Sequence, residues 1–178
     1  MSTTYIGIIR DHSMSMQGLT TAARIDYNAS IASIKDAAQT SGVKTYVSTV
    51  ICGSGVHPEL KQVPICEVNE LVVYNANGRD TPLFDSVMEI INQFTKISYE
   101  DPTGIFVILS TTDGENNVGS VTAQVLGNAM REKQKSDRWT FTFRVPPGYK
   151  QTLVRMGIAD GNIIEWEQTK AGVEQASA

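Results

Sequence analysis

The segment Tyr5-Ile6-Gly7-Ile8-Ile9 is followed, after one arginine, by Asp11-His12-Ser13-Met14-Ser15. The first segment is apolar and predicts a buried strand, so the polar segment falls in the loop beyond the end of that strand. Alternate residues of an extended chain point the same way, which allows Asp11, Ser13 and Ser15 to converge. Three hard oxygen donors on one short loop suit Mg²⁺ or a similar cation. Taken alone, the pattern is also typical of an Asx or Ser turn that caps the next helix.

The composition limits the class of protein. The chain has 178 residues, a length typical of one domain with a sizeable core, and we expect a single domain over 1–178. A net charge of -4 gives no basic stripe, so we expect no nucleic-acid partner. We find neither an apolar run of membrane length nor the features of a signal peptide. We therefore expect a cytoplasmic protein that binds no membrane, with Cys52 and Cys66 reduced and buried as small apolar residues, unless they face each other across a hairpin.

Strand and helix patterns alternate along the chain. The expected helices cover about 18–40, the segment that Thr81-Pro82 opens, 120–134 and 150–156. Tyr27 and Ile31 are expected on the apolar face of the first helix, and Val125 is expected in the core on the third. The expected strands cover 4–10, 43–52, 105–109, 139–145 and 163–166. This alternation predicts an α/β fold with a mainly parallel central sheet and helices on both faces.

Three loops of this fold bring oxygen donors to one edge of the sheet. Asp11 and Asp113 each follow the end of an apolar strand directly, and Thr81 lies at the start of a helix, where we expect it to act as the cap. Sheets of this type bind ligands at the carboxyl ends of their strands. The sequence therefore predicts a ligand site at this edge.

Three motifs at these positions have the order and spacing of a known metal site. They are Asp11-His12-Ser13-Met14-Ser15-Met16, then Thr81 within Gly78-Arg79-Asp80-Thr81-Pro82-Leu83-Phe84-Asp85, and Thr112-Asp113-Gly114-Glu115-Asn116. Together they resemble the metal-ion-dependent adhesion site (MIDAS) of the von Willebrand factor A (vWA) domain. The similarity extends over nearly the whole chain, including Gly157-Ile158 through Gly161-Asn162-Ile163.

The resemblance implies a Rossmann-like sheet with one antiparallel edge strand, for which 60–68 is our candidate. It implies that Ser13, Ser15 and Thr81 give hydroxyl oxygens to Mg²⁺ (or Mn²⁺ or Ca²⁺), while Asp11 and Asp113 act directly or through water. A last helix would pack against the sheet, and because 173–178 looks like its first turns, we expect it to be short or truncated.

The function implied by the resemblance is that of a non-enzymatic adaptor. Its metal would bind an Asp or Glu of a partner protein, and an AAA-type ATPase is one candidate partner. His12 occupies a variable position of the motif and is not expected to bind the metal. The helix dipole is enough to explain Asp85 in the first turn of its helix, with support of the metal site as the alternative.

Two other functions are compatible with the residues. One is a Mg²⁺-dependent hydrolase or phosphotransferase that uses Asp11, although the haloacid-dehalogenase type needs a second aspartate where Ser13 stands. The other is a structural subunit of a larger assembly. Neither His12 nor His57 has a placement that suits a Ser-His-Asp triad, and Gly53-Ser54-Gly55 lacks the third glycine of a dinucleotide loop.

Overall fold

A computed structural model describes residues 2–112, 116–145, 148–155 and 157–165. In this part of the chain, one sheet has the strand order β3-β2-β1-β5-β6-β7, with β4 also paired to β2. The strands are β1 (Thr4–Asp11), β2 (Thr45–Cys52), β3 (Val56–Pro58), β4 (Val63–Pro64), β5 (Ile105–Thr111), β6 (Trp139–Val145) and β7 (Ile163–Glu165). The α-helices are α1 (Thr20–Ser41), α2 (Leu83–Glu100), α3 (Ala123–Lys133) and α4 (Lys150–Arg155). Short 3₁₀ turns occupy Met14–Leu19, Ile65–Glu67 and Asp160–Asn162.

The sheet is parallel except at one edge. Strands β2, β1, β5, β6 and β7 pair in parallel, and β3 and β4 both pair antiparallel with β2. The predicted mainly parallel α/β sheet with an antiparallel edge is therefore confirmed.

The position of the antiparallel edge was predicted only in part. Within 60–68, only Val63–Pro64 forms a strand, and the longer partner of β2 is Val56–Pro58. The chain reverses between β2 and β3 through Gly53 (φ 150), Ser54 (φ 50) and Gly55 (φ 106), so pairing resumes immediately after the turn.

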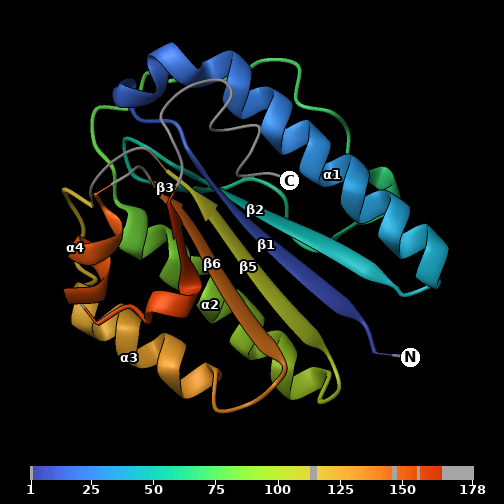
Figure 1. The fold of residues 1–178 in the computed structure, drawn as a ribbon. Helices are drawn as coiled ribbons and strands as arrows, with labels where there is room; N and C mark the ends of the chain where they lie inside the picture. The colour runs from blue at the N-terminus through green and yellow to red at the C-terminus, as the bar shows by residue number, and fades with distance from the viewer. Residues whose placement is uncertain (1, 113–115, 146–147, 156, 166–178) are drawn as a thin grey trace.

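Helices cover both faces of the sheet, as predicted: α1 lies on one face, and α2 and α3 lie on the other (Figure 1). Alternate residues of β1 serve the two faces, because side chains of a strand point alternately up and down. Ile6 and Ile8 belong to the cluster that contains Tyr27 and Ile31 of α1. The larger cluster joins the strands to α2, α3 and α4 through residues that include Phe84, Phe94, Phe106, Leu126, Phe143 and Leu153.

Three predictions about single residues are wrong. The residue before α2 is Pro82, and neither its side chain nor Thr81 caps the helix. Val125, expected in the core, is 52% exposed because it lies on the outer side of the first turn of α3. Cys66 is exposed in a 3₁₀ turn, whereas Cys52 is buried as expected, and both thiols are free. The expected final helix at 173–178 lies outside the described residues.

Candidate metal site

The loop after β1 brings the three predicted oxygen donors together. Asp11 is fully buried, and its Oδ1 accepts hydrogen bonds from the Ser13 N–H (2.9 Å) and the Ser13 hydroxyl (2.6 Å). Ser13 Oγ also lies 3.0 Å from Ser15 Oγ. Asp11 and Ser13 are buried and Ser15 is exposed, so the oxygen donors extend from the protein interior to its surface.

A fourth residue, Thr112, joins this cluster from the end of β5. Its buried hydroxyl donates to Oδ2 of Asp11, so both carboxylate oxygens are hydrogen-bonded. The sequence places Thr112 directly before Asp113, and its place in the motif was the signal that could have identified it. Asp113 itself lies outside the described residues, and its role as a ligand stays a prediction.

Two glycines allow other chain segments to pack directly against this loop. The Met14 N–H donates to Gly78 O and the Gly78 N–H donates to His12 O, both at 2.9 Å. A Cβ on Gly78 would lie 2.8 Å from the Cα of Gly53, and one on Gly53 would lie 3.1 Å from the His12 carbonyl carbon. This close packing of backbones fixes the course of residues 11–15, which carry the candidate site and which we call the metal loop.

Thr81 lies three residues beyond Gly78, at the same rim, and is 4% exposed. Its N–H donates to Asn117 Oδ1 (2.8 Å), and the Asn117 N–H donates back to Thr81 O (3.2 Å). Asn116 Oδ1 accepts from the Phe84 N–H (2.9 Å) and so performs the capping that the sequence assigned to Thr81. These bonds tie the loop after β5 to the start of α2.

Asp85 performs a related task. Its carboxylate accepts from the Ser120 N–H (3.2 Å), the Ser120 hydroxyl (3.0 Å) and the Val121 N–H (3.3 Å). It therefore fixes the segment that precedes α3, a role beyond the favourable helix-dipole interaction that we expected.

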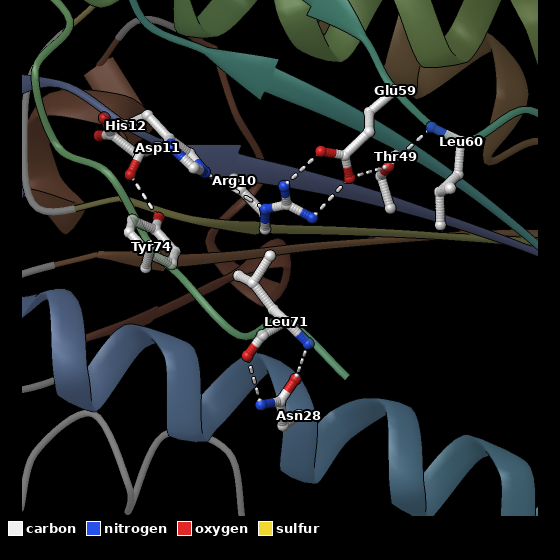
Figure 2. A network of polar contacts seen from close by, with 9 residues as sticks. All are labelled: Arg10, Asp11, His12, Asn28, Thr49, Glu59, Leu60, Leu71 and Tyr74. Atoms are coloured by element: carbon white, nitrogen blue, oxygen red, sulfur yellow. Dashed lines mark hydrogen bonds and ion pairs between the residues drawn. The ribbon is translucent and has the colours of Figure 1, made fainter. Parts of the chain in front are cut away.

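Residues 68–78, which we call the strap, run from α1 to the metal loop (Figure 2). Asn28 of α1 holds the backbone of Leu71 with two hydrogen bonds, of 3.0 and 2.7 Å. The Tyr74 hydroxyl donates to the backbone oxygen of Asp11, and the Tyr74 ring stacks on His12 at 4.2 Å between centroids. Sequence reasoning missed Tyr74, because its partners are distant in sequence and follow no period.

An ion pair lies beside the metal loop. Arg10 Nη1 and Nη2 donate to the two oxygens of Glu59 at 2.9 and 2.8 Å (Figure 2). Arg10 Nε donates to Nε2 of His12 at 3.3 Å, so that ring nitrogen serves as an acceptor within the protein. Burial, together with the charge of Arg10, lowers the pKa of His12. The bond from Arg10 occupies Nε2 of His12, and the expectation that His12 does not bind the metal stays a prediction.

The donor set fits a hard cation. A hydroxyl that donates its proton to Asp11, as that of Ser13 does, keeps lone pairs for a metal. Within the residues that the structure describes, no group of three or more His, Cys, Asp or Glu side chains is placed to hold a metal. Ser13, Ser15 and Thr112 contribute hydroxyl oxygens at this site, and oxygen donors suit a hard divalent cation.

Comparison with known proteins shows the fold. No protein-family model matches this chain, and no curated protein sequence matches it. It is similar to proximal thread matrix protein 1 from the mussel byssus (TM-score 0.67, 15% identity), with 99% of this chain and 46% of that chain covered. A structure of the same protein with a zinc-occupied MIDAS motif gives the same values. The pilus adhesin SpaC of Lactobacillus rhamnosus GG, in its open conformation, gives a TM-score of 0.72 at 11% identity, with 99% and 29% covered.

At these identities the similarity establishes a shared fold. The chain spans about half the length (46%) of the matrix protein that it matches. No helix in the described ranges is long and apolar enough to cross a membrane.

Proposed function

We propose that this chain is a metal-dependent protein-binding module of the vWA type. A divalent cation held by the rim loops would bind a carboxylate of a partner protein. The observation that carries this proposal is the cluster of Asp11, Ser13, Ser15 and Thr112 at the carboxyl edge of a parallel sheet.

Each residue of the cluster has a role in this proposal. The bound cation supplies an electrophilic position for a carboxylate. Ser13 and Ser15 hold it through their hydroxyl oxygens, with Thr81 and Asp113 completing the set. Asp11 is fully buried and accepts hydrogen bonds at both oxygens, so it orients Ser13 and acts on the cation through water.

The similar structures support a binding role. One of them is described as a thread matrix protein with zinc in its MIDAS motif, and another as a pilus adhesin. Mg²⁺ remains our expectation for this chain because its donors are oxygens. A partner that offers Asp or Glu, of which an AAA-type ATPase is one class, and a cytoplasmic location belong to the same proposal.

The burial of Asp11 argues against the hydrolase alternative. A nucleophilic carboxylate must reach the substrate, but Asp11 is 0% exposed and its oxygens already accept bonds from Ser13 and Thr112. We expect no turnover of generic phosphate esters such as p-nitrophenyl phosphate with Mg²⁺ present.

A pull-down from a native lysate tests the proposal, with wild type, wild type in chelator, and Thr81→Ala as baits. We expect a partner that only wild type with Mg²⁺ retains, and a partner retained equally by all three would contradict a metal-dependent site. Size-exclusion chromatography with and without chelator separates the structural-subunit alternative, which predicts a change of assembly when the metal is removed.

A further inference from the structure

A groove of about 410 Å³ lies beside the metal loop. The turn before β3 and β3 itself form one wall, with Ser54 and His57, and the strap forms the other, with Val73, Asn75 and Asn77. The volume falls within the range of about 300–1,000 Å³ that is typical of binding pockets.

The groove adjoins the backbone of the loop that carries the candidate metal site. His12 and Gly78 line it, and both are bonded to the segment that carries Ser13: Ser13 forms a parallel bridge with Gly78, and the Gly78 N–H donates to His12 O. A ligand bound at Ser13 therefore has the groove as its immediate neighbour.

The charges within the groove cancel. Arg10 and Glu59 line it, and two hydrogen bonds of 2.9 and 2.8 Å join their side chains. The Arg10 side chain is 4% exposed, and its Nε is bonded to His12. A charged group entering the groove would lose hydration without finding an unpaired opposite charge there, so an uncharged group is favoured.

Apolar side chains are exposed on the strap beside the groove. Seven large apolar residues are exposed in the described part of the chain, and two of them, Val72 (80%) and Val73 (61%), are adjacent on the strap. Val73 also lines the groove. Apolar surface gathered beside polar groups is typical of a protein-binding surface.

We propose that the groove selects the partner. The partner segment would give an Asp or Glu to the cation and would place a bulky uncharged side chain, aliphatic or aromatic, in the groove beside Val73. Because Ser13 bridges to Gly78, which lines the groove, the two residues should lie close together in the partner, within about three positions, or about 10 Å, of an extended segment. This inference rests on the proposed metal-dependent function and adds the chemistry of the partner.

Selection from a random peptide library on phage tests the metal-dependent function and the role of the groove separately. The immobilised full chain is loaded with Mg²⁺, and bound phage are eluted with chelator. An acidic residue in the eluted peptides supports the metal function. Enrichment of a bulky uncharged residue within about three positions of that acid supports the groove.

Variants then test whether the bulky peptide side chain binds in the groove beside Val73. We expect Val73→Lys to weaken binding of the best peptide by tenfold or more and to leave Mg²⁺ binding unchanged. Replacing the bulky peptide residue by alanine should weaken binding to wild type similarly, but should have little further effect on Val73→Lys. Tyr99→Lys is the matched control, because Tyr99 is 80% exposed in the last turn of α2, far from Thr81 at the other end.

The outcomes are distinct. The proposed role of the groove would be overturned if the chelator-eluted peptides were acidic but had no enriched bulky neighbour. Equal peptide binding by wild type and Val73→Lys would overturn it as well. Both outcomes would leave the metal function standing. A selection that yields no acidic peptide would count against the metal function and therefore against the groove as well.

Discussion

Oδ1 of Asp11 accepts two hydrogen bonds from Ser13, one from its N–H at 2.9 Å and one from its hydroxyl at 2.6 Å. An asparagine at position 11 can still accept both bonds through Oδ1, and its Nδ2 can donate to the Thr112 hydroxyl, which then acts as the acceptor, but it carries no charge. We therefore expect Asp11→Asn to abolish the heat of Mg²⁺ binding in calorimetry while the melting temperature stays near that of wild type. Asp11→Ala should lose both the heat and about 1–3 kcal/mol of stability, because Ser13 and Thr112 lose a buried acceptor. Wild-type heats from Asp11→Asn would contradict a role for this charge.

Removal of the metal should leave the domain folded. The proposed ligands lie on rim loops, whereas the core consists of residues such as Phe84, Phe106 and Phe143, all at most 2% exposed. A weakly bound cation adds roughly 1–3 kcal/mol at ordinary excess. Each kcal/mol corresponds to about 2–4 °C for a domain of this size. Thermal denaturation in Mg²⁺ and in chelator measures the difference, and a collapse of the cooperative transition in chelator would show that the metal is needed for folding.

Gly78→Ala should disturb the metal loop from outside it. The added methyl group would lie 2.8 Å from Gly53 Cα and 2.9 Å from His12 O, both backbone atoms that cannot turn away. We expect a loss of about 1–3 kcal/mol in urea denaturation and weaker Mg²⁺ binding. Gly161→Ala is the control, since no atom lies within 4 Å of its added methyl group. Equal stability of the two variants would mean that the backbones separate without cost.

The two cysteines should differ in reactivity. Burial raises the pKa of the Cys52 thiol to about 12, and the residue is fully buried, whereas Cys66 is exposed. A thiol reacts as its thiolate, so Cys52 should be inert in the native protein. Titration with a disulfide reagent should therefore detect one thiol per native chain and two in denaturant. Cys66→Ser should show none when native, and reaction of that variant would place Cys52 at the surface.

Glu59→Gln should reveal a pH-dependent contribution to stability. Burial alone would raise the pKa of Glu59, but its bonds to Arg10 and the charge of Arg10 outweigh this and hold the pKa below its usual value. A lowered folded pKa contributes stability above the unfolded value of about 4.3, and this stability is lost as the pH falls through the folded pKa. The Glu59 side chain is 36% exposed, so we expect a loss of only about 1 kcal/mol at pH 7, shrinking towards pH 3.

Urea denaturation of wild type and Glu59→Gln at pH 7 and pH 3 measures this difference. The exposed Glu70→Gln is the control and should match wild type at both pH values. If the difference in unfolding free energy between wild type and Glu59→Gln were as large at pH 3 as at pH 7, the effect would come from packing rather than from charge.

The sequence predicted those features whose signals are periodic. The apolar run from Ile105 to Leu109 identified the central strand, and the spacing of Tyr27 and Ile31 identified the buried side of α1. Strand β3 was missed because three residues carry no readable period, and its position depends on the turn at Gly53–Gly55.

At the candidate site, local sequence predicted the convergence of Asp11, Ser13 and Ser15, because these residues lie within five consecutive positions. The expected extended loop is present only as far as Ser13, since Ser15 lies in the 3₁₀ turn Met14–Leu19. Local sequence could not predict that Asn116 would cap α2, because the bond to Phe84 spans 32 positions. Nor could it predict the hydrogen bonds between Asn28 and Leu71, which are 43 positions apart in the sequence. Contacts of this kind exist only after the sheet has brought separate loops to one edge.

The anchors of the strap have a consequence for how this protein can change over evolutionary time. Leu71 is held by Asn28 and Tyr74 by Asp11, one on each side of Val72 and Val73. The two valines are 80% and 61% exposed, so their replacement disturbs neither the helix nor the oxygen cluster. Under the proposed function, variation at 72 and 73 would therefore change partner recognition while the ion chemistry stays constant, so specificity and metal binding would diverge independently among descendants of one ancestor.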